Sequence, residues 1–173
     1  MKNSSEFYRS NKLGLLVAAS ILLAITLGCN FSAGTGDFAK PEMPSTEQQN
    51  ASVKQTLKDV TKAIDTGDFS SFRATLTEEF QAQYSEDKLK STFQGLIDKK
   101  GVLLPIMQSA DSKTPQFTSP PSIEKEGAYY TMQYKGNFPT DPAKTYIEFK
   151  YAWQKSQWKP YLVDVHFDSD KDK

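Results

Sequence analysis

The amino-acid sequence predicts an α+β fold, in which three N-terminal helices pack on a curved, mainly antiparallel sheet of four or five strands. Two observations carry this prediction. Apolar residues recur at helical spacing between residues 52 and 101, and they alternate with polar residues between 128 and 167. A chain of 173 residues with one apolar N-terminal run has room for one such domain and a tether.

The helical part is expected to begin at Ser52, because Ser52 and Gln55 have the spacing of a capping box. Gly67 is expected to end this first helix. A second helix is predicted over 70–84 and a third over 85–101. The apolar stripes of the three helices are Val53, Leu57, Val60 and Ile64, then Phe72, Leu76 and Phe80, then Leu89, Phe93 and Leu96.

The predicted sheet begins with a strand over 102–107, which Pro105 would place at an edge or a bulge. Residues 111–127 are polar and proline-rich, with an irregular strand expected around 116–118. Strict alternation then predicts three further strands, with a short hairpin turn between the last two, over 128–135, 145–155 and 158–167.

Cys29, the only cysteine of the chain, directly follows an apolar run over 13–27. A basic opening precedes this run and a stretch rich in Gly, Ser and Pro follows it, which is the order of parts in a secretory signal. A cysteine just after the cut resembles the lipobox of bacterial lipoproteins, where a fatty acid such as palmitate is attached. We therefore expect a lipid anchor on Cys29 and a location on the cell-envelope membrane, the outer one in a diderm host.

Two alternatives to the lipid anchor stay open, a retained transmembrane anchor and a secreted protein that is cut after Ala33 or Gly34. A bilayer span needs roughly 20 apolar residues, and the run is shorter, so we favour lipidation. The predicted organisation is a signal peptide over 1–28, a flexible tether over 29–50, an α+β domain over 51–168 and a charged tail over 169–173.

The charge of the chain argues against nucleic acid as a partner. Basic and acidic residues number 21 each, and the formal net charge is zero. Arg73 is the only arginine beyond the apolar run, whereas nucleic-acid binders gather Arg and Lys on one face.

A resemblance to a known superfamily rests on two stretches, LKDVTKAIDTGDFSSFRATLTEEF and WKPYLVDVHF, with a third helix and further strands between them. These stretches resemble the cone-shaped, cystatin-like fold that is shared by nuclear transport factor two, ketosteroid isomerase and SnoaL-type cyclases. The small domains of this superfamily on bacterial envelope lipoproteins are the most similar. The resemblance implies a pocket between the sheet and the helices, and a dimer through the open sheet face.

The inward phase of the strands supplies the residues that would line such a pocket. With tyrosine hydroxyls as orienting groups, they would suit an apolar ligand, but alternating aromatics are also what any half-buried sheet needs. We favour an ordinary packed core. The possible pocket residues are Tyr130, Met132, Tyr134, Phe149, Tyr151 and Trp153, joined by Tyr161 and Val163.

No catalytic residue is predicted, because the inward strand positions offer no carboxylate for the acid–base work of an isomerase. Asp111 lies in a loop, and Glu148 and Asp164 fall on the outward phase. Asp164, His166 and Asp168 alternate at the end of the last strand, but one histidine beside a charged tail is the pattern of a solvated face. No metal or other cofactor is therefore expected.

The function that the sequence favours is a non-catalytic one. The chain is expected to be a membrane-anchored envelope lipoprotein whose domain binds a partner protein or a small apolar ligand. An enzyme of the ketosteroid isomerase or SnoaL type is the first alternative. A homodimerising structural module is the second, and Tyr146, Ala152 and Leu162 would offer the outward apolar surface for it.

Overall fold

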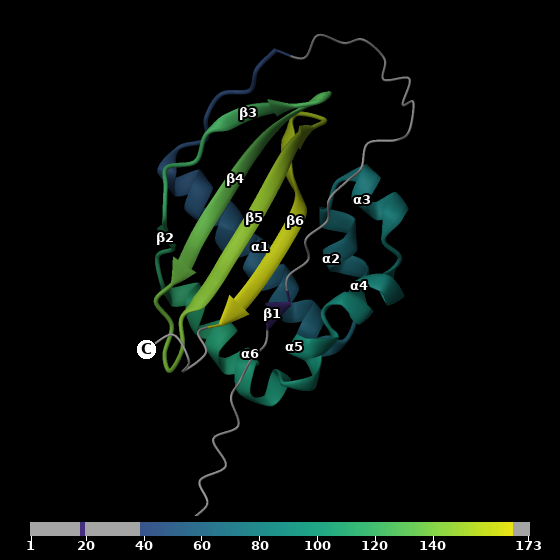
Figure 1. Ribbon diagram of the computed structural model, residues 1–173, viewed down its shortest axis with the longest axis vertical. Helices are drawn as coiled ribbons and strands as arrows, with labels where there is room; N and C mark the ends of the chain where they lie inside the picture. Colours follow the sequence, from purple (N-terminus) through teal and green to yellow (C-terminus); the bar gives the residue numbers. More distant parts are fainter. Residues whose placement is uncertain (1–17, 20–38, 168–173) are drawn as a thin grey trace, which may run out of the picture.

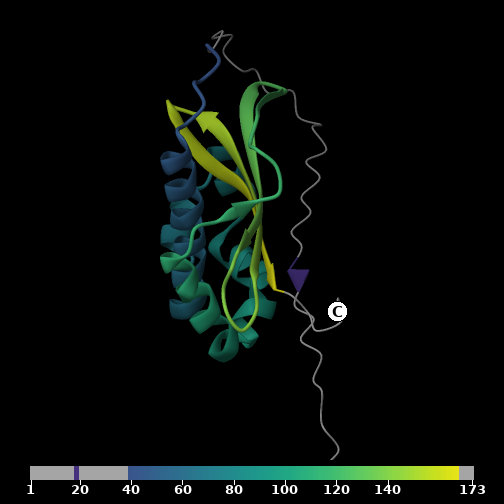
Figure 2. The same ribbon diagram turned by 90° about the vertical axis from the view of Figure 1, so that its left-hand side faces the viewer.

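The computed structural model describes residues 18–19 and 39–167. Helices and an antiparallel sheet form two layers, and the helices cover one face of the sheet (Figure 1, Figure 2). The strand order is β1 (Ala18–Ala19), β6 (Gln157–Phe167), β5 (Thr145–Gln154), β4 (Tyr129–Phe138) and β2 (Gln116–Phe117), and β3 (Ile123–Glu126) also pairs with β4. The predicted α+β class with an antiparallel sheet is confirmed. Cys29, most of the predicted signal peptide and the charged tail lie outside the described residues.

Helix α1 (Thr46–Thr66) begins six residues before the predicted start. Its capping box is formed by Ser45, whose side chain accepts a hydrogen bond from the Gln48 N–H, and by Gln48, whose side chain accepts one from the Ser45 N–H. The prediction of Ser52 as the cap is therefore wrong, and the last part of the predicted tether is helical. Gly67 ends the helix in the left-handed conformation, as predicted, with φ at 73°.

The helix predicted over 70–84 is two helices, α2 (Ser70–Thr75) and α3 (Glu78–Gln83). Thr77 separates them, because its backbone is extended and its hydroxyl caps α3 by accepting from the Phe80 N–H. The backbone N–H of Thr77 donates a hydrogen bond to the Pro160 carbonyl of the sheet. The predicted stripe is nevertheless buried throughout, at Phe72, Leu76 and Phe80.

The strand predicted over 102–107 is wrong, because these residues lie in a helix. After α4 (Glu86–Thr92), which Ser85 caps as predicted, the chain continues through three further helical segments, α5 (Gln94–Asp98), α6 (Lys100–Ser109) and η1 (Ala110–Ser112). Gly101 lies inside α6 and does not end a helix. Leu103, Leu104, Ile106 and Met107 are buried while Val102 and Pro105 are exposed, which is helical spacing.

The strands of the second half agree closely with the alternation in the sequence. They are β2 (Gln116–Phe117), β3 (Ile123–Glu126), β4 (Tyr129–Phe138), β5 (Thr145–Gln154) and β6 (Gln157–Phe167). Only β3 was not predicted, because it lies in the proline-rich stretch. Lys155 and Ser156 both have positive φ, which gives the predicted tight turn between β5 and β6.

A bulge between β5 and β6 changes the face on which Tyr161 lies. Lys150 pairs with Leu162 and Tyr151 pairs with Pro160, so Tyr161 is the extra residue. Its hydroxyl donates to Glu126 of β3, at 2.9 Å. The prediction that Tyr161 points inward with Val163 is therefore wrong, and only Val163 belongs to the core.

Candidate functional site

Four of the predicted pocket residues form the packed centre of the domain. Met132, Tyr134, Phe149 and Tyr151 are at most 2 % exposed, and the rings of Tyr134 and Tyr151 meet edge to face with their centres 5.5 Å apart. Phe117 of β2 packs on Tyr134 from the other side, with 5.2 Å between the ring centres.

The two tyrosine hydroxyls in this centre already have partners. The Tyr151 hydroxyl lies 2.8 Å from the Thr56 hydroxyl of α1, and the Tyr134 hydroxyl donates to the Met132 sulfur at 3.1 Å. Burial raises the pKa of both tyrosines above the ordinary value, so both stay protonated at neutral pH. These hydroxyls are therefore groups of the core and are not available to orient a ligand.

The other two predicted pocket residues, Tyr130 and Trp153, are only partly buried. The Lys125 ammonium lies 5.9 Å from the centre of the Tyr130 ring. Trp153 packs on Trp158 of β6, with 5.2 Å between the ring centres. Both residues therefore lie near the hairpin ends of the sheet, away from its buried centre.

The acidic and basic groups that an enzyme of the cone type would need lie away from the buried tyrosines. Glu148 is on the open sheet face, where Lys135 lies 3.3 Å away and the Gln133 amide donates to it. On the same face, His166 contacts Asp164 at 3.3 Å and stacks on Tyr146. None of these groups meets Tyr134 or Tyr151.

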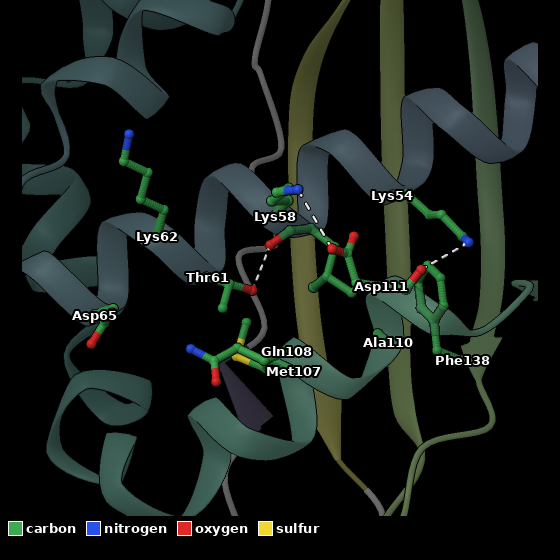
Figure 3. A pocket seen from close by; sticks show the side chains of 11 residues that line it. Lys54, Lys58, Thr61, Lys62, Asp65, Met107, Gln108, Ala110, Asp111 and Phe138 are labelled. Atoms are coloured by element: carbon green, nitrogen blue, oxygen red, sulfur yellow. Dashed lines mark hydrogen bonds and ion pairs between the residues drawn. The ribbon is translucent and has the colours of Figure 1, made fainter.

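A hollow of about 290 Å³ lies between α1 and the α6–η1 segment (Figure 3). We call it the α1–α6 groove. The apolar residues of its lining, which we call its floor, are Leu57, Met107, Ala110 and Phe138, each at most 3 % exposed, and Thr61 and Gln108 add polar groups. Its volume is close to the lower limit of about 300 Å³ for sites that hold small molecules.

Three lysines of α1 border the groove, Lys54, Lys58 and Lys62. Residues four apart lie on the same side of a helix, so the three lysines form one row along α1. Lys54 and Lys58 reach toward Asp111, whereas the Lys62 side chain points away from the α6 wall (Figure 3). Asp65 and Asp111 are the acidic residues of the lining. The rim of the groove therefore has a net positive charge above an apolar floor.

Lys54 and Lys58 both contact Asp111 across the groove, and both can still bind a ligand. Lys58 lies 3.4 Å from the Asp111 carboxylate, but both side chains are more than half exposed, so water screens the pair and it adds little stability. Lys54 donates to the backbone carbonyl of Asp111 at 3.1 Å. An anionic group can exchange with these contacts at small cost, because neither lysine is locked in a buried pair.

A second hollow, of about 220 Å³, lies on the open face of the sheet beside the 119–122 loop. Its lining is mainly polar and includes two glutamates and two lysines, Glu124, Glu126, Lys135 and Lys150. Lys150 pairs with Glu126 at 3.6 Å, and Lys135 pairs with Glu148. Both lysines of this hollow thus have a carboxylate partner on the sheet, whereas the α1–α6 groove has three lysines and one printed ion pair, Lys58–Asp111.

The part of the chain that the structure describes has neither a cluster of metal ligands nor a helix that could span a membrane. In 18–19 and 39–167, no three His, Cys, Asp or Glu side chains are grouped so that they could hold a metal ion. Among the helices of the same ranges, none combines the length and the apolar character that crossing a membrane requires. Asp168, the third residue of the alternating series at the chain end, lies outside these ranges.

Neither a family model, nor a curated protein, nor a solved structure matches this chain.

The α1–α6 groove is not predicted by the sequence pattern. The spacing of Lys54, Lys58 and Lys62 was the signal for one wall, because it gives a single basic stripe along a helix. The opposite wall includes Met107, for which the sequence pattern predicts a strand. A groove between two helices cannot be predicted when the pattern favours a strand for one of them.

Proposed function

We propose that this chain is a lipid-anchored envelope protein whose domain binds a small ligand with an apolar body and an acidic group, without catalysis. The α1–α6 groove carries the proposal, because a row of three lysines borders an apolar floor there. Ligand sites in proteins commonly combine a mostly apolar lining with a few polar groups that fix the orientation of the ligand.

The anchor in this proposal is a lipid on Cys29, which follows the apolar run directly. Lipid anchoring gains about 0.8 kcal/mol per buried CH₂ group. From Cys29 to the start of α1 at Thr46 the extended chain spans at most about 60 Å. Such a tether would present the domain close to the membrane, where amphiphilic acids are plentiful, and by resemblance to diderm lipoproteins this is the outer membrane.

The proposal keeps the resemblance to the cone-shaped superfamily, but it places the ligand site at a different position in the fold. In that superfamily the pocket lies between the sheet and the helices. Here Tyr134, Phe149 and Tyr151 fill this space, which supports binding at the α1–α6 groove in its place. It also supports the non-catalytic proposal, since protonated tyrosines cannot act as general bases near neutral pH.

The ligand class follows from the two kinds of surface in the groove. A carboxylate or a sulfonate would reach the lysine ammonium groups, while a hydrocarbon body would lie along the lysine stems and over the small exposed parts of Leu57 and Met107. Lysine suits this task because its ammonium sits on a flexible stem that can follow an acidic group. We use decanoate as the test compound, since it combines one carboxylate with a hydrocarbon chain.

The test is a calorimetric titration of the protein after its N-terminal apolar run (13–27) has been removed by proteolysis. A specific protease site is inserted between Gly34 and Thr35 of the full chain, and we call this protein the cleavable chain. Its cut removes none of the named core residues, which lie between Val53 and Phe167. Decanoate is compared with decanol, which lacks the charge, and with acetate, which lacks the chain.

Decanoate should bind measurably. Decanol should bind at least about tenfold more weakly, since charged contacts of this kind contribute roughly 1.5–3 kcal/mol. Acetate should also bind at least about tenfold more weakly, because it lacks the hydrocarbon chain, which contributes about 0.8 kcal/mol per buried CH₂ group. Replacing Lys54 and Lys58 together by Gln should weaken decanoate binding by about tenfold or more. Lys90→Gln, on α4, is the matched control and should change nothing. Equal binding of decanol, or an unchanged affinity in the double variant, would exclude the groove as the site.

A further inference from the structure

Strand β6 has one fully paired edge and one edge that is only partly used. Along its whole length it pairs with β5. On the other edge, the Pro160 carbonyl accepts a hydrogen bond from Thr77 at 3.1 Å, and the short strand β1 (Ala18–Ala19) pairs with Val165 and His166 near the other end of β6 (Figure 1).

The two halves of this edge differ in their protection against pairing with another strand. The first half contains Pro160, which has no N–H to donate, and the bulge at Tyr161. Residues 162–167 contain no Pro, Gly or Lys, and they alternate with Val163, Val165 and Phe167 facing the core. The second half is therefore a regular strand edge, and its pairing with β1 shows that it accepts an antiparallel strand.

Asp164 lies in this second half and lacks a full set of partners. Its Oδ1 atom is buried and accepts no hydrogen bond from any of the described residues. Its Oδ2 atom lies 3.3 Å from Nδ1 of His166, on the same strand. A buried carboxylate oxygen without a donor costs free energy, so a donor brought to this edge by another chain would stabilise the complex.

We propose that β6 pairs antiparallel with β6 of a second copy of this chain, with the two-fold axis at Val165. In this register Asp164 faces the partner subunit's His166, and His166 faces the partner subunit's Asp164. Asp164 and His166 lie on either side of Val165 in the sequence. A two-fold axis at Val165 therefore places the acid of each copy opposite the imidazole of the other. The open strand edge then closes on itself, so the assembly stops at a dimer.

The second copy takes the place that Ala18 and Ala19 hold on β6. In the cell the inference therefore rests on the proposed removal of residues 1–28. The cleavable chain makes the test independent of that removal, because its cut detaches β1 whether or not a signal peptidase acts on the chain. The cut also detaches Cys29, so a disulfide cannot imitate the dimer.

The experiment measures molar mass by light scattering before and after the cut, with a reductant present throughout. The uncut chain should be a monomer and the cut chain a dimer. A cut chain that stays monomeric, or an uncut chain that is already dimeric, would overturn the proposal. Native signal cleavage is followed separately by intact mass, so failure of the lipoprotein proposal would be recognised on its own.

Charge variants test the register. His166→Asp places two aspartates opposite each other and should weaken the dimer by roughly tenfold or more, since like charges directly opposite destabilise a strand pair. Adding Asp164→His to this variant restores opposite partners and should restore the dimer. Gln157→Asp, in the protected half of β6, is the matched control and should leave the mass unchanged. A dimer that tolerates His166→Asp, or that the swap fails to restore, would refute this register.

Discussion

The Tyr151 hydroxyl, in the middle of the sheet, lies 2.8 Å from the Thr56 hydroxyl of α1 and donates to the Ser52 carbonyl at 3.3 Å. Because Tyr151 gives its proton to Ser52, Thr56 is the donor in the other contact. These bonds tie the longest helix to the centre of β5. The Tyr151 hydroxyl, which could have lined a pocket, therefore stabilises the packing of the helix on the sheet.

Removing this hydroxyl should lower stability without changing the fold. Tyr151→Phe leaves the Thr56 hydroxyl buried without its acceptor, and we expect a loss of about 1–2 kcal/mol in the free energy of unfolding. Urea denaturation measures it. Combining it with Thr56→Val should cost less than the sum of the single changes by about 1 kcal/mol. Strictly additive losses would mean that the two hydroxyls do not interact.

Two aromatic residues of the inward stripe of β5, Phe149 in its middle and Trp153 near the hairpin, should differ in their contribution to stability. Phe149 is completely buried, and Phe149→Ala should cost about 3–5 kcal/mol. Trp153 is only partly buried, so Trp153→Ala should cost less by at least about 1 kcal/mol. Thermal or urea unfolding of both variants gives the comparison. An equal loss at the two positions would contradict the burial described for β5.

Asp164 gives the domain a pH dependence with a defined sign. Burial raises the pKa of its carboxyl above the usual value, although His166 and Lys135 oppose this rise and Glu148 adds to it. A raised folded-state pKa means that its contribution to stability is fully present below the unfolded-state pKa and is lost as the pH rises through the folded-state value. Ionised Asp164 therefore destabilises the monomer at neutral pH.

Asp164→Asn should consequently make the uncut chain more stable than the wild type at pH 7, and the difference should shrink as the pH falls towards about 4. Unfolding curves at several pH values measure this. Asp98→Asn, at an exposed helical position, is the control and should show no such pH-dependent gain. A variant that is less stable than the wild type at pH 7 would mean that the His166 contact outweighs the cost of burial.

The proposed anchor makes a prediction that does not depend on the folded domain. Metabolic labelling with an alkyne fatty acid should label the wild-type chain, and Cys29→Ala should remove the label because the chain has no other thiol. Asn30→Ala, beside the cysteine, is the control and should keep it. Equal labelling of the wild type and Cys29→Ala would exclude lipidation at this residue.

The alternation along β4 to β6 was sufficient to predict the sheet, because a half-buried antiparallel strand must place apolar residues on one face. It was not sufficient for Tyr161, since the bulge that shifts this residue depends on how β6 meets β5. Ser45 and Ser52 both begin a Ser-x-x-Gln sequence, so local spacing could not decide between two starts of α1. The short apolar run at 102–107 fits either a buried strand or a buried helix.

The α1–α6 groove could not be predicted from the sequence for a related reason. Its floor joins Leu57 of α1, Met107 of α6 and Phe138 at the end of β4, which are brought together only by the folded chain. The lysine row was visible in the sequence, but a row of lysines on a helix is most often a solvated face. Only the apolar floor below it distinguishes a binding site.

Photolabelling with a diazirine-bearing decanoate tests the central claim most directly, because mass spectrometry of the labelled peptides locates the ligand in the cleavable chain. We expect the label on residues 54–62 of α1 and 107–111 of the opposite wall, and we expect excess decanoate to remove it. Label on the peptides that contain Tyr134 and Tyr151 would contradict this, since it would place the ligand between the sheet and the helices.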